Sequence, residues 1–158
     1  MNETNHTFGS PDPDVHYRNC LSAHVVILRG SELAVIPTTD GYALPGGALA
    51  EGESPEQAIW QHCLKALGYD VRVDDWIISA DSWTTIEGAP CHLTQSYYLG
   101  ELLDPLFEDA DTRLHWLALD RAKTLLRPAD HAAVQSHLNR ETSAAALAFI
   151  DGKHEFYG

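Results

Sequence analysis

Apolar and β-branched residues gather in short runs that Gly, Pro and polar residues interrupt. Such runs occupy residues 21–28, 32–36, 76–83, 93–103 and 114–117, and their composition predicts β-strands. The Arg-Gly-Ser break at residues 29–31 predicts that the first two runs form a hairpin. Residues 88–90, Gly-Ala-Pro, are expected to form part of the connection between the third and fourth strands.

One helix has clear signals at both of its ends. Ser54 is a good N-cap, Pro55 suits the first helical position, and Gln57 completes a capping-box pattern. Gly68 is a natural left-handed C-cap. The sequence therefore predicts a helix over residues 55–67.

The predicted helix has two chemically different sides. At 100° per residue, the side expected to face the core carries Ile59, Trp60, Cys63 and Leu67. The opposite side carries Gln61, His62 and Lys65. Any chemistry on this helix is therefore expected from an amide, an imidazole and an ammonium group.

Two further helices are predicted near the end of the chain, over residues 120–126 and 129–140, with Pro128 between them. Strands with interspersed helices predict a mixed α/β layered domain, here over residues 19–141. Residues 1–18 lack periodicity and are expected to form a flexible arm. The alanine-rich, then aromatic and polar tail over residues 142–158 has no assigned structure.

Composition limits the classes of function. A chain of 158 residues suits one domain. The formal net charge of −13 opposes binding to nucleic acid or to an anionic membrane. The sequence has neither an apolar run long enough to span a membrane nor a secretory signal, so a cytoplasmic protein is expected. The 3 cysteines show no CxxC pair and are interpreted as packing residues.

One conjunction of motifs resembles the Nudix box, the signature of hydrolases that cleave nucleoside diphosphates linked to another moiety. The segment Leu-Pro-Gly-Gly ends at Gly47, and the capped helix follows it. The residues in register with the box are Gly47, Glu53, Cys63, Gly68 and Tyr69. Residues 116–125 are similar to the final strand and helix entry of the family. The resemblance implies a Nudix-like α/β/α sandwich with a mixed β-sheet.

The box is degenerate at the positions that carry the chemistry of the family. Its Arg-Glu pair is replaced by Gln61-His62, and its later Glu-Glu pair by Lys65-Ala66. The resemblance implies a Mg²⁺ cofactor held by the glutamates of this helix. Magnesium prefers hard oxygen ligands, so imidazole and ammonium groups are poor substitutes. We therefore expect the standard metal-dependent catalytic site to be impaired.

The same substitutions suggest a phosphate site without a metal. Gln61, His62 and Lys65 could bind a phosphate of a nucleotide or of another phosphorylated metabolite through charge-assisted hydrogen bonds. The preceding Gly46 and Gly47 complete the predicted ligand-binding set. Glu53 is the one box acid in register, and it is the candidate catalytic residue and metal ligand.

Two classes of function follow from the residues. The first is a non-catalytic Nudix-fold module that binds a small phosphorylated ligand or uses the old cleft against a protein partner. The second is a divergent active hydrolase that recruits acids from outside the box, with the candidates Asp81, Glu87, Glu101 and Glu108. Homodimerisation is common in the family and is compatible with either class.

Overall fold

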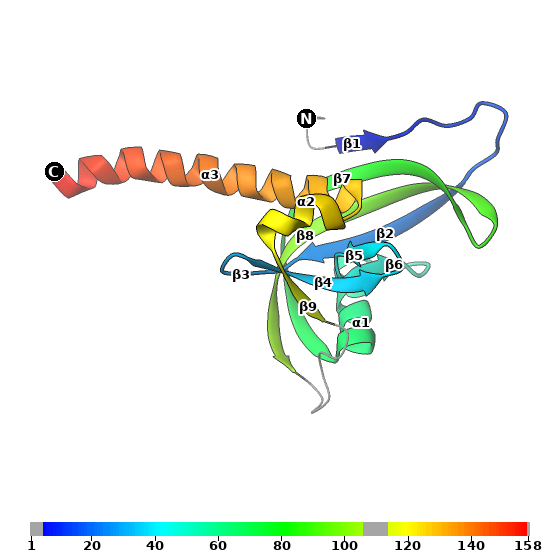
Figure 1. The fold of residues 1–158 in the computed structure, drawn as a ribbon, viewed down its shortest axis with the longest axis horizontal. Helices are drawn as coiled ribbons and strands as arrows, with labels where there is room; N and C mark the ends of the chain where they lie inside the picture. Colours follow the sequence, from blue (N-terminus) through cyan, green and yellow to red (C-terminus); the bar gives the residue numbers. More distant parts are fainter. Residues whose placement is uncertain (1–4, 106–113, 158) are drawn as a thin grey trace.

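The computed structural model describes residues 5–105 and 114–157. The strands are β1 (Asn5–Phe8), β2 (Arg18–Val26), β3 (Leu28–Arg29), β4 (Glu32–Thr38), β5 (Gly41–Ala43), β6 (Gly46–Ala48), β7 (Tyr69–Ile86), β8 (Ala89–Pro105) and β9 (His115–Ala118). The helices are α1 (Pro55–Leu67), α2 (Leu119–Leu125) and α3 (Pro128–Tyr157). Figure 1 shows α1 on one side of the strands and α2 with the start of α3 on the other.

The strands form two sheets. The larger has the order β1-β7-β8-β2-β6, and the smaller joins β3, β4 and β5, with β9 paired to β4. In the larger sheet β2 pairs parallel with β8, whereas β7 with β8 and β2 with β6 are antiparallel. The predicted α/β class with a mixed sheet is confirmed. No helix in the described ranges is both long enough and apolar enough to cross a membrane.

The strand pairing differs from the predicted hairpin of residues 21–28 and 32–36. The strand β2 ends at Val26 and belongs to the larger sheet, so of the predicted first strand of the hairpin the short β3 is the part that pairs with β4. Along β2 the side chains alternate between two packed faces, because Ala23 and Val25 join the core on the α1 side while Val26 joins the other core. A segment covered on both faces suits the interior of a mixed sheet better than a hairpin.

A long hairpin of 18 and 17 residues joins β7 to β8. Glu87 and Gly88 have φ angles of 51° and 79°, the positive values that a tight two-residue turn of the I′ type requires. Ala89 and Pro90 therefore pair with β7. The prediction that these two residues lie in the connection is wrong. Both strands also extend well beyond the predicted ranges of residues 76–83 and 93–103.

Both ends of the chain hold regular structure that the sequence did not predict. Residues 5–8, inside the expected flexible arm, form β1, which pairs parallel with β7. Phe8 of this strand packs against the core, which holds the segment in place. The helix α3 continues through the unassigned tail to Tyr157 and projects away from the rest of the molecule in Figure 1. Alanine has the highest helix propensity, and Ala144–Ala148 lies in this extension.

The helix α1 has the predicted bounds and ends. Ser54 accepts a hydrogen bond from Gln57 N, the Gln57 side chain accepts one from Ser54 N, and Gly68 is left-handed. The predicted apolar side is wrong at Trp60, which is 38% exposed and donates its indole N–H to Asp70 Oδ1 at 2.8 Å. Ala58 is buried instead. The polar end of the indole thus turns the ring toward the surface.

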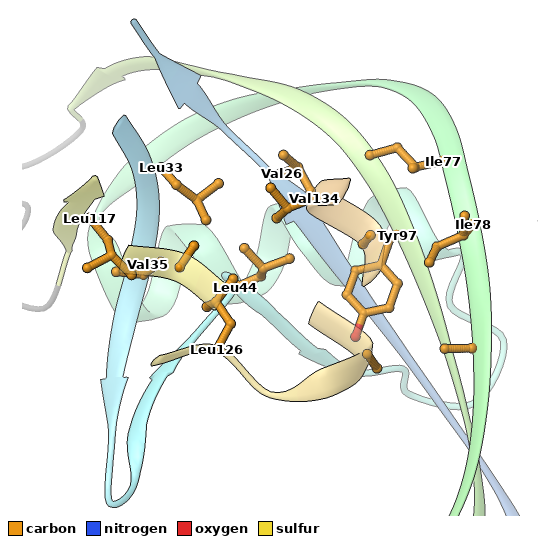
Figure 2. Packing of buried hydrophobic residues seen from close by; sticks show 14 residues of the cluster. Val26, Leu33, Val35, Leu44, Ile77, Ile78, Tyr97, Leu117, Leu126 and Val134 are labelled. Carbon is orange, nitrogen blue, oxygen red and sulfur yellow. The ribbon is translucent and has the colours of Figure 1, made fainter. Parts of the chain in front are cut away.

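The two sides of the larger sheet bury separate apolar clusters. One cluster includes Ile59 and Cys63 of α1 packed against Ala23 and Val25 of β2. The other lies under α2 and α3, and Figure 2 shows Tyr97 of β8 among its aliphatic side chains. These two cores make the sandwich.

A buried carboxylate connects α3 to the second core. Asp130 has no solvent exposure, and it accepts hydrogen bonds from Leu44 N at 3.1 Å and from the Tyr97 hydroxyl at 2.5 Å. Arg127, half exposed, donates to the same carboxylate at 3.2 Å. A buried charge is tolerated only with such partners. Asp130 therefore fixes α3 against β8 and against the backbone before β6.

We expect Asp130→Ala to be strongly destabilising. It leaves the Tyr97 hydroxyl and the Leu44 N–H buried without an acceptor, so the free energy of unfolding should fall by roughly 3–5 kcal/mol. Tyr97→Phe, which removes one donor, should cost only about 1–2 kcal/mol. Urea denaturation followed by tryptophan fluorescence measures both. Asp75→Ala, at an exposed position of β7, is the control, and a similar loss in all three variants would contradict the network.

Candidate functional site

A cavity with a volume of about 650 Å³ lies beside β2 and β8. The segment after β6 and the tip of the β7–β8 hairpin complete its walls. Apolar side chains, Leu21, Leu49, Ile86 and Leu93, line part of it. Its size and mixed lining are those of a small-molecule site.

Three polar side chains from neighbouring strands form a buried group in this cavity. Ser22 Oγ lies 3.1 Å from His24 Nε2, and Gln95 Nε2 lies 3.4 Å from the same nitrogen. All three residues are buried, although they line the cavity. The His24 ring stacks on Tyr97 with the centroids 5.4 Å apart. The Asp130 network thus supports this polar floor through Tyr97.

Burial sets the protonation of His24. Desolvation lowers its pKa to about 4, Asp130 opposes this shift, and the charge of Arg127 adds to it. The imidazole is therefore neutral near pH 7, with one donor and one acceptor nitrogen. A neutral ring beside an amide and a hydroxyl suits the hydrogen-bonding edge of a ligand better than a charged group.

Charged groups surround the cavity and differ in sign. Its cations are Arg18 and Arg127, and its carboxylates are Glu51, Glu53 and Glu87. Arg127 also donates a hydrogen bond to the Asp130 carboxylate, and Arg18 donates from Nε to Cys91 Sγ at 3.2 Å. Because Arg18 also donates to Ile86 O at the hairpin tip and lies within the field of Glu87, an anionic group would be best placed beside Arg127.

The structure gives Glu53 and the two glycines local roles. Glu53 Oε1 accepts a hydrogen bond from Ala50 N at 2.9 Å, and Glu53 N donates to Ala50 O, so this residue closes the turn before α1. A Cβ on Gly46 would lie 2.1 Å from Ala23 O. A Cβ on Gly47 would lie 2.6 Å from the His62 ring. Gly46 thus permits close strand pairing, and Gly47 makes room for the imidazole.

The remaining predicted ligand residues lie on the α1 side of β6. His62 Nε2 lies 2.9 Å from Ala48 O, Gln61 is half-buried and Lys65 is exposed. None of the three lines the cavity, although Glu53 does. Because β6 is the edge of its sheet, a ligand in the cavity could reach this helix face only around that edge.

The donor groups in the described part of the chain do not fit a magnesium ion. No group of three or more His, Cys, Asp or Glu in residues 5–105 and 114–157 is arranged to hold a metal. The acids considered for a rebuilt site are dispersed: Asp81 binds His92 and Thr94, and Glu101 pairs with Arg72 at 2.6 Å. Of these candidates in the described ranges, Glu87 lines the cavity together with Glu51 and Glu53, and Glu108 lies outside the described residues.

The sequence reasoning missed the polar floor and both arginines. Ser22 and His24 are polar residues at alternate positions of an otherwise apolar strand. Alternate residues lie on the same face of a strand, so this pattern indicates one polar face. Gln95 has the same relation to β8. Their meeting depends on the parallel pairing of β2 with β8, in which Ser22 lies opposite Gln95. No local pattern in the sequence predicts that register.

Comparison with known proteins identifies the fold. No protein-family model and no curated protein matches the sequence. Among solved structures, a MutT Nudix hydrolase from Burkholderia pseudomallei has a TM-score of 0.60 at 22% identity over 75% of this chain and 98% of that one. A Nudix hydrolase from Nitrosomonas europaea gives 0.59 at 16% identity, over 77% and 90%.

An ADP-ribose pyrophosphatase from Streptococcus suis is also similar, with a TM-score of 0.55 at 19% identity over 78% of this chain and 91% of that one. The chain has the Nudix hydrolase fold. This confirms the resemblance drawn from the residues around Gly47 and Gly68. In this fold Ser22 and His24 of the cavity lie on the face of β2 opposite Ala23 and Val25, while Leu49 of the cavity wall packs against the α1 cluster.

His24 should make stability depend on pH. Its pKa of about 4 in the folded state lies below the ordinary 6.5, so the unfolded chain binds more protons between these values. Stability should thus be full above pH 6.5 and fall by up to about 3 kcal/mol as the pH drops toward 4. Chemical denaturation across this range should show a shallower decline in His24→Gln. The exposed His16→Gln control should keep the wild-type slope; equal slopes in all three would contradict a neutral buried His24.

Proposed function

We propose that this Nudix-fold protein binds a nucleotide or another small phosphorylated metabolite in the cavity beside β2 and β8, and that standard magnesium-dependent hydrolysis is impaired. The observation that carries the proposal is the pairing of a formed, mixed polar and apolar cavity with a helix α1 that lacks the expected acids. The solved structures of similar fold include an ADP-ribose pyrophosphatase, which favours a nucleotide diphosphate as the ligand class.

The impairment is argued from the groups that α1 presents. Where the family has glutamates, this helix has an imidazole already engaged with Ala48 O, an ammonium on Lys65 and the methyl group of Ala66. An ammonium repels a divalent ion, and a methyl group offers no ligand. Glu53 is held by Ala50 N, so its carboxylate is partly satisfied without a metal.

The ligand class is argued from the lining of the cavity. Leu21, 55% exposed, and Leu93 offer apolar surface for a planar base, and Gln95 with Ser22 and neutral His24 offers hydrogen bonds to its edge. The guanidinium of Arg127 has donors beyond those that Asp130 uses, and it can hold a phosphate oxygen. The net charge of −13 makes such local cations necessary for an anionic ligand.

The helix face has a second part in the proposal. A diphosphate that extends from the cavity around the β6 edge would meet Gln61, His62 and Lys65, with Lys65 as its cation. The competing function is a divergent hydrolase that uses Glu53, Glu51 and Glu87, because these carboxylates share the cavity. The two functions differ in whether a product forms and whether Mg²⁺ is needed.

We expect nucleotide binding that does not need a metal. Isothermal titration with ADP-ribose and other nucleoside-diphosphate derivatives should give the same affinity in EDTA as in magnesium, and chromatography of each mixture should show intact ligand. Metal-independence follows because the charges near the phosphate belong to side chains. Binding that disappears in EDTA, or product that accumulates with Mg²⁺ or Mn²⁺, would reject the proposal in favour of the divergent hydrolase.

Two substitutions test the two parts of the site separately. Gln95→Leu should weaken binding by about tenfold, because it removes one buried hydrogen-bonding group of about 1.4 kcal/mol. Lys65→Glu should weaken binding by a similar factor and only for ligands with a diphosphate. Arg121→Glu, on the exposed side of α2, is the charge control. Wild-type affinity in Gln95→Leu would exclude the cavity, and wild-type affinity in Lys65→Glu would exclude the helix face.

A further inference from the structure

Two cysteines lie side by side where β2 pairs with β8. In the parallel register Cys91 is opposite Arg18 and Cys20 is opposite Leu93, so the cysteines are diagonal neighbours. The Cys20 thiol donates to Cys91 Sγ at a sulfur separation of 3.0 Å. A disulfide bond is about 2.05 Å long, so a relative displacement of roughly 1 Å would join the two sulfurs.

Arg18 makes the two sulfurs unequal. Its Nε donates to Cys91 Sγ at 3.2 Å. Burial by itself disfavours a thiolate at Cys91, but the hydrogen bonds from Cys20 and Arg18 and the charge of Arg18 outweigh it and lower the Cys91 pKa. The hydrogen bond to Cys91 raises the Cys20 pKa, because Cys20 holds the shared proton. Of the two sulfurs, Cys91 is thus the one that more readily carries a negative charge, and Cys20 the one that donates the shared proton.

The sulfur that is more accessible to solvent is the other one, Cys20. Cys20 is partly exposed and lines the cavity, whereas Cys91 has no exposure. A small oxidant that enters the cavity therefore meets Cys20 first. Cys63 provides a contrast within the same chain, because its burial in α1 raises its pKa to about 12 and keeps it a protonated, inaccessible thiol.

We propose that Cys20 and Cys91 form a redox-active dithiol that a small hydroperoxide converts to a disulfide. Cys20 passes its proton to the Cys91 sulfur and attacks one oxygen of hydrogen peroxide. The O–O bond breaks, an S–O bond forms, and the leaving hydroxide takes a proton from solvent to become water. Cys91 then attacks the sulfur of the Cys20 sulfenic acid, and the hydroxyl leaves with the Cys91 proton as a second water. Two electrons pass from the sulfurs to the peroxide.

This site does not depend on the proposed function, although it borders the same cavity. The disulfide would join β2 to β8 at the wall of the cavity and would weaken the hydrogen bond that Arg18 donates to Cys91. Because Arg18 lines the cavity, its guanidinium would then be more available there. The dithiol can therefore be tested in the ligand-free protein.

The direct test is peptide mapping after oxidation. The full-length protein is reduced, freed of reductant, treated with one equivalent of hydrogen peroxide, quenched, alkylated and digested. We expect most of the chain to lose two hydrogen atoms and to yield one cross-linked peptide pair, Cys20 with Cys91, while Cys63 is alkylated only after denaturation. Accumulation of Cys20 sulfinic acid with Cys91 still reduced, or a cross-link that contains Cys63, would overturn the proposal.

Variants test the assignment of the two sulfurs. Arg18→Gln should slow disulfide formation about tenfold, because it removes the hydrogen bond and the charge that favour a negative Cys91 sulfur. Arg121→Gln is the charge-matched control and Cys63→Ala the cysteine control, and both should react at the wild-type rate. In Cys20→Ser, Cys91 should resist peroxide. Near-ultraviolet circular dichroism checks that each variant is folded. A folded Arg18→Gln protein that reacts at the wild-type rate would overturn the proposal.

Discussion

The hydrogen bonds of the buried Asp130 carboxylate are the interaction on which the packing of α3 against the larger sheet depends. It gathers a backbone N–H from the segment before β6, the Tyr97 hydroxyl from β8 and the Arg127 guanidinium ahead of α3. These partners come from three separate parts of the chain, and an uncompensated charge there would be costly. The α3 packing, the position of Tyr97 and the stacked His24 ring are therefore set together. A polar floor for the cavity is the consequence.

The ends of α1 are set by contacts that do not involve the polar side of the helix. The capping box and Gly68 specify where the helix begins and ends, and neither depends on metal ligands. Gly47 keeps space for the side chain at position 62, which is now an imidazole bonded to Ala48 O. Glu53 closes the turn that leads into the helix. Each of these positions has a structural role that does not need the missing acids. This explains how they can remain in register with the Nudix box.

Local signals explain what the sequence could predict. The ends of α1, the α/β class and the existence of β9 follow from caps, breakers and short-range patterns, because those effects act within a few residues. The partner of β2 could not be predicted, because its parallel pairing with β8 joins residues about seventy positions apart, as with Cys20 and Cys91. Trp60 was misplaced because its indole N–H finds Asp70, a tertiary contact. The cavity residues depend on the same distant pairing.

The strand β2 separates two kinds of chemistry. Ala23 and Val25 face α1, whereas Ser22 and His24 face the cavity, as the period of two in a strand requires. Of the box positions, Gln61, His62 and Lys65 lie on the first side, whereas Glu53 borders the cavity. None of Gln61, His62 and Lys65 belongs to the cavity lining. The ends of α1 and the floor of the cavity thus depend on different contacts, because the capping box and Gly68 act within α1 whereas the floor depends on the pairing of β2 with β8.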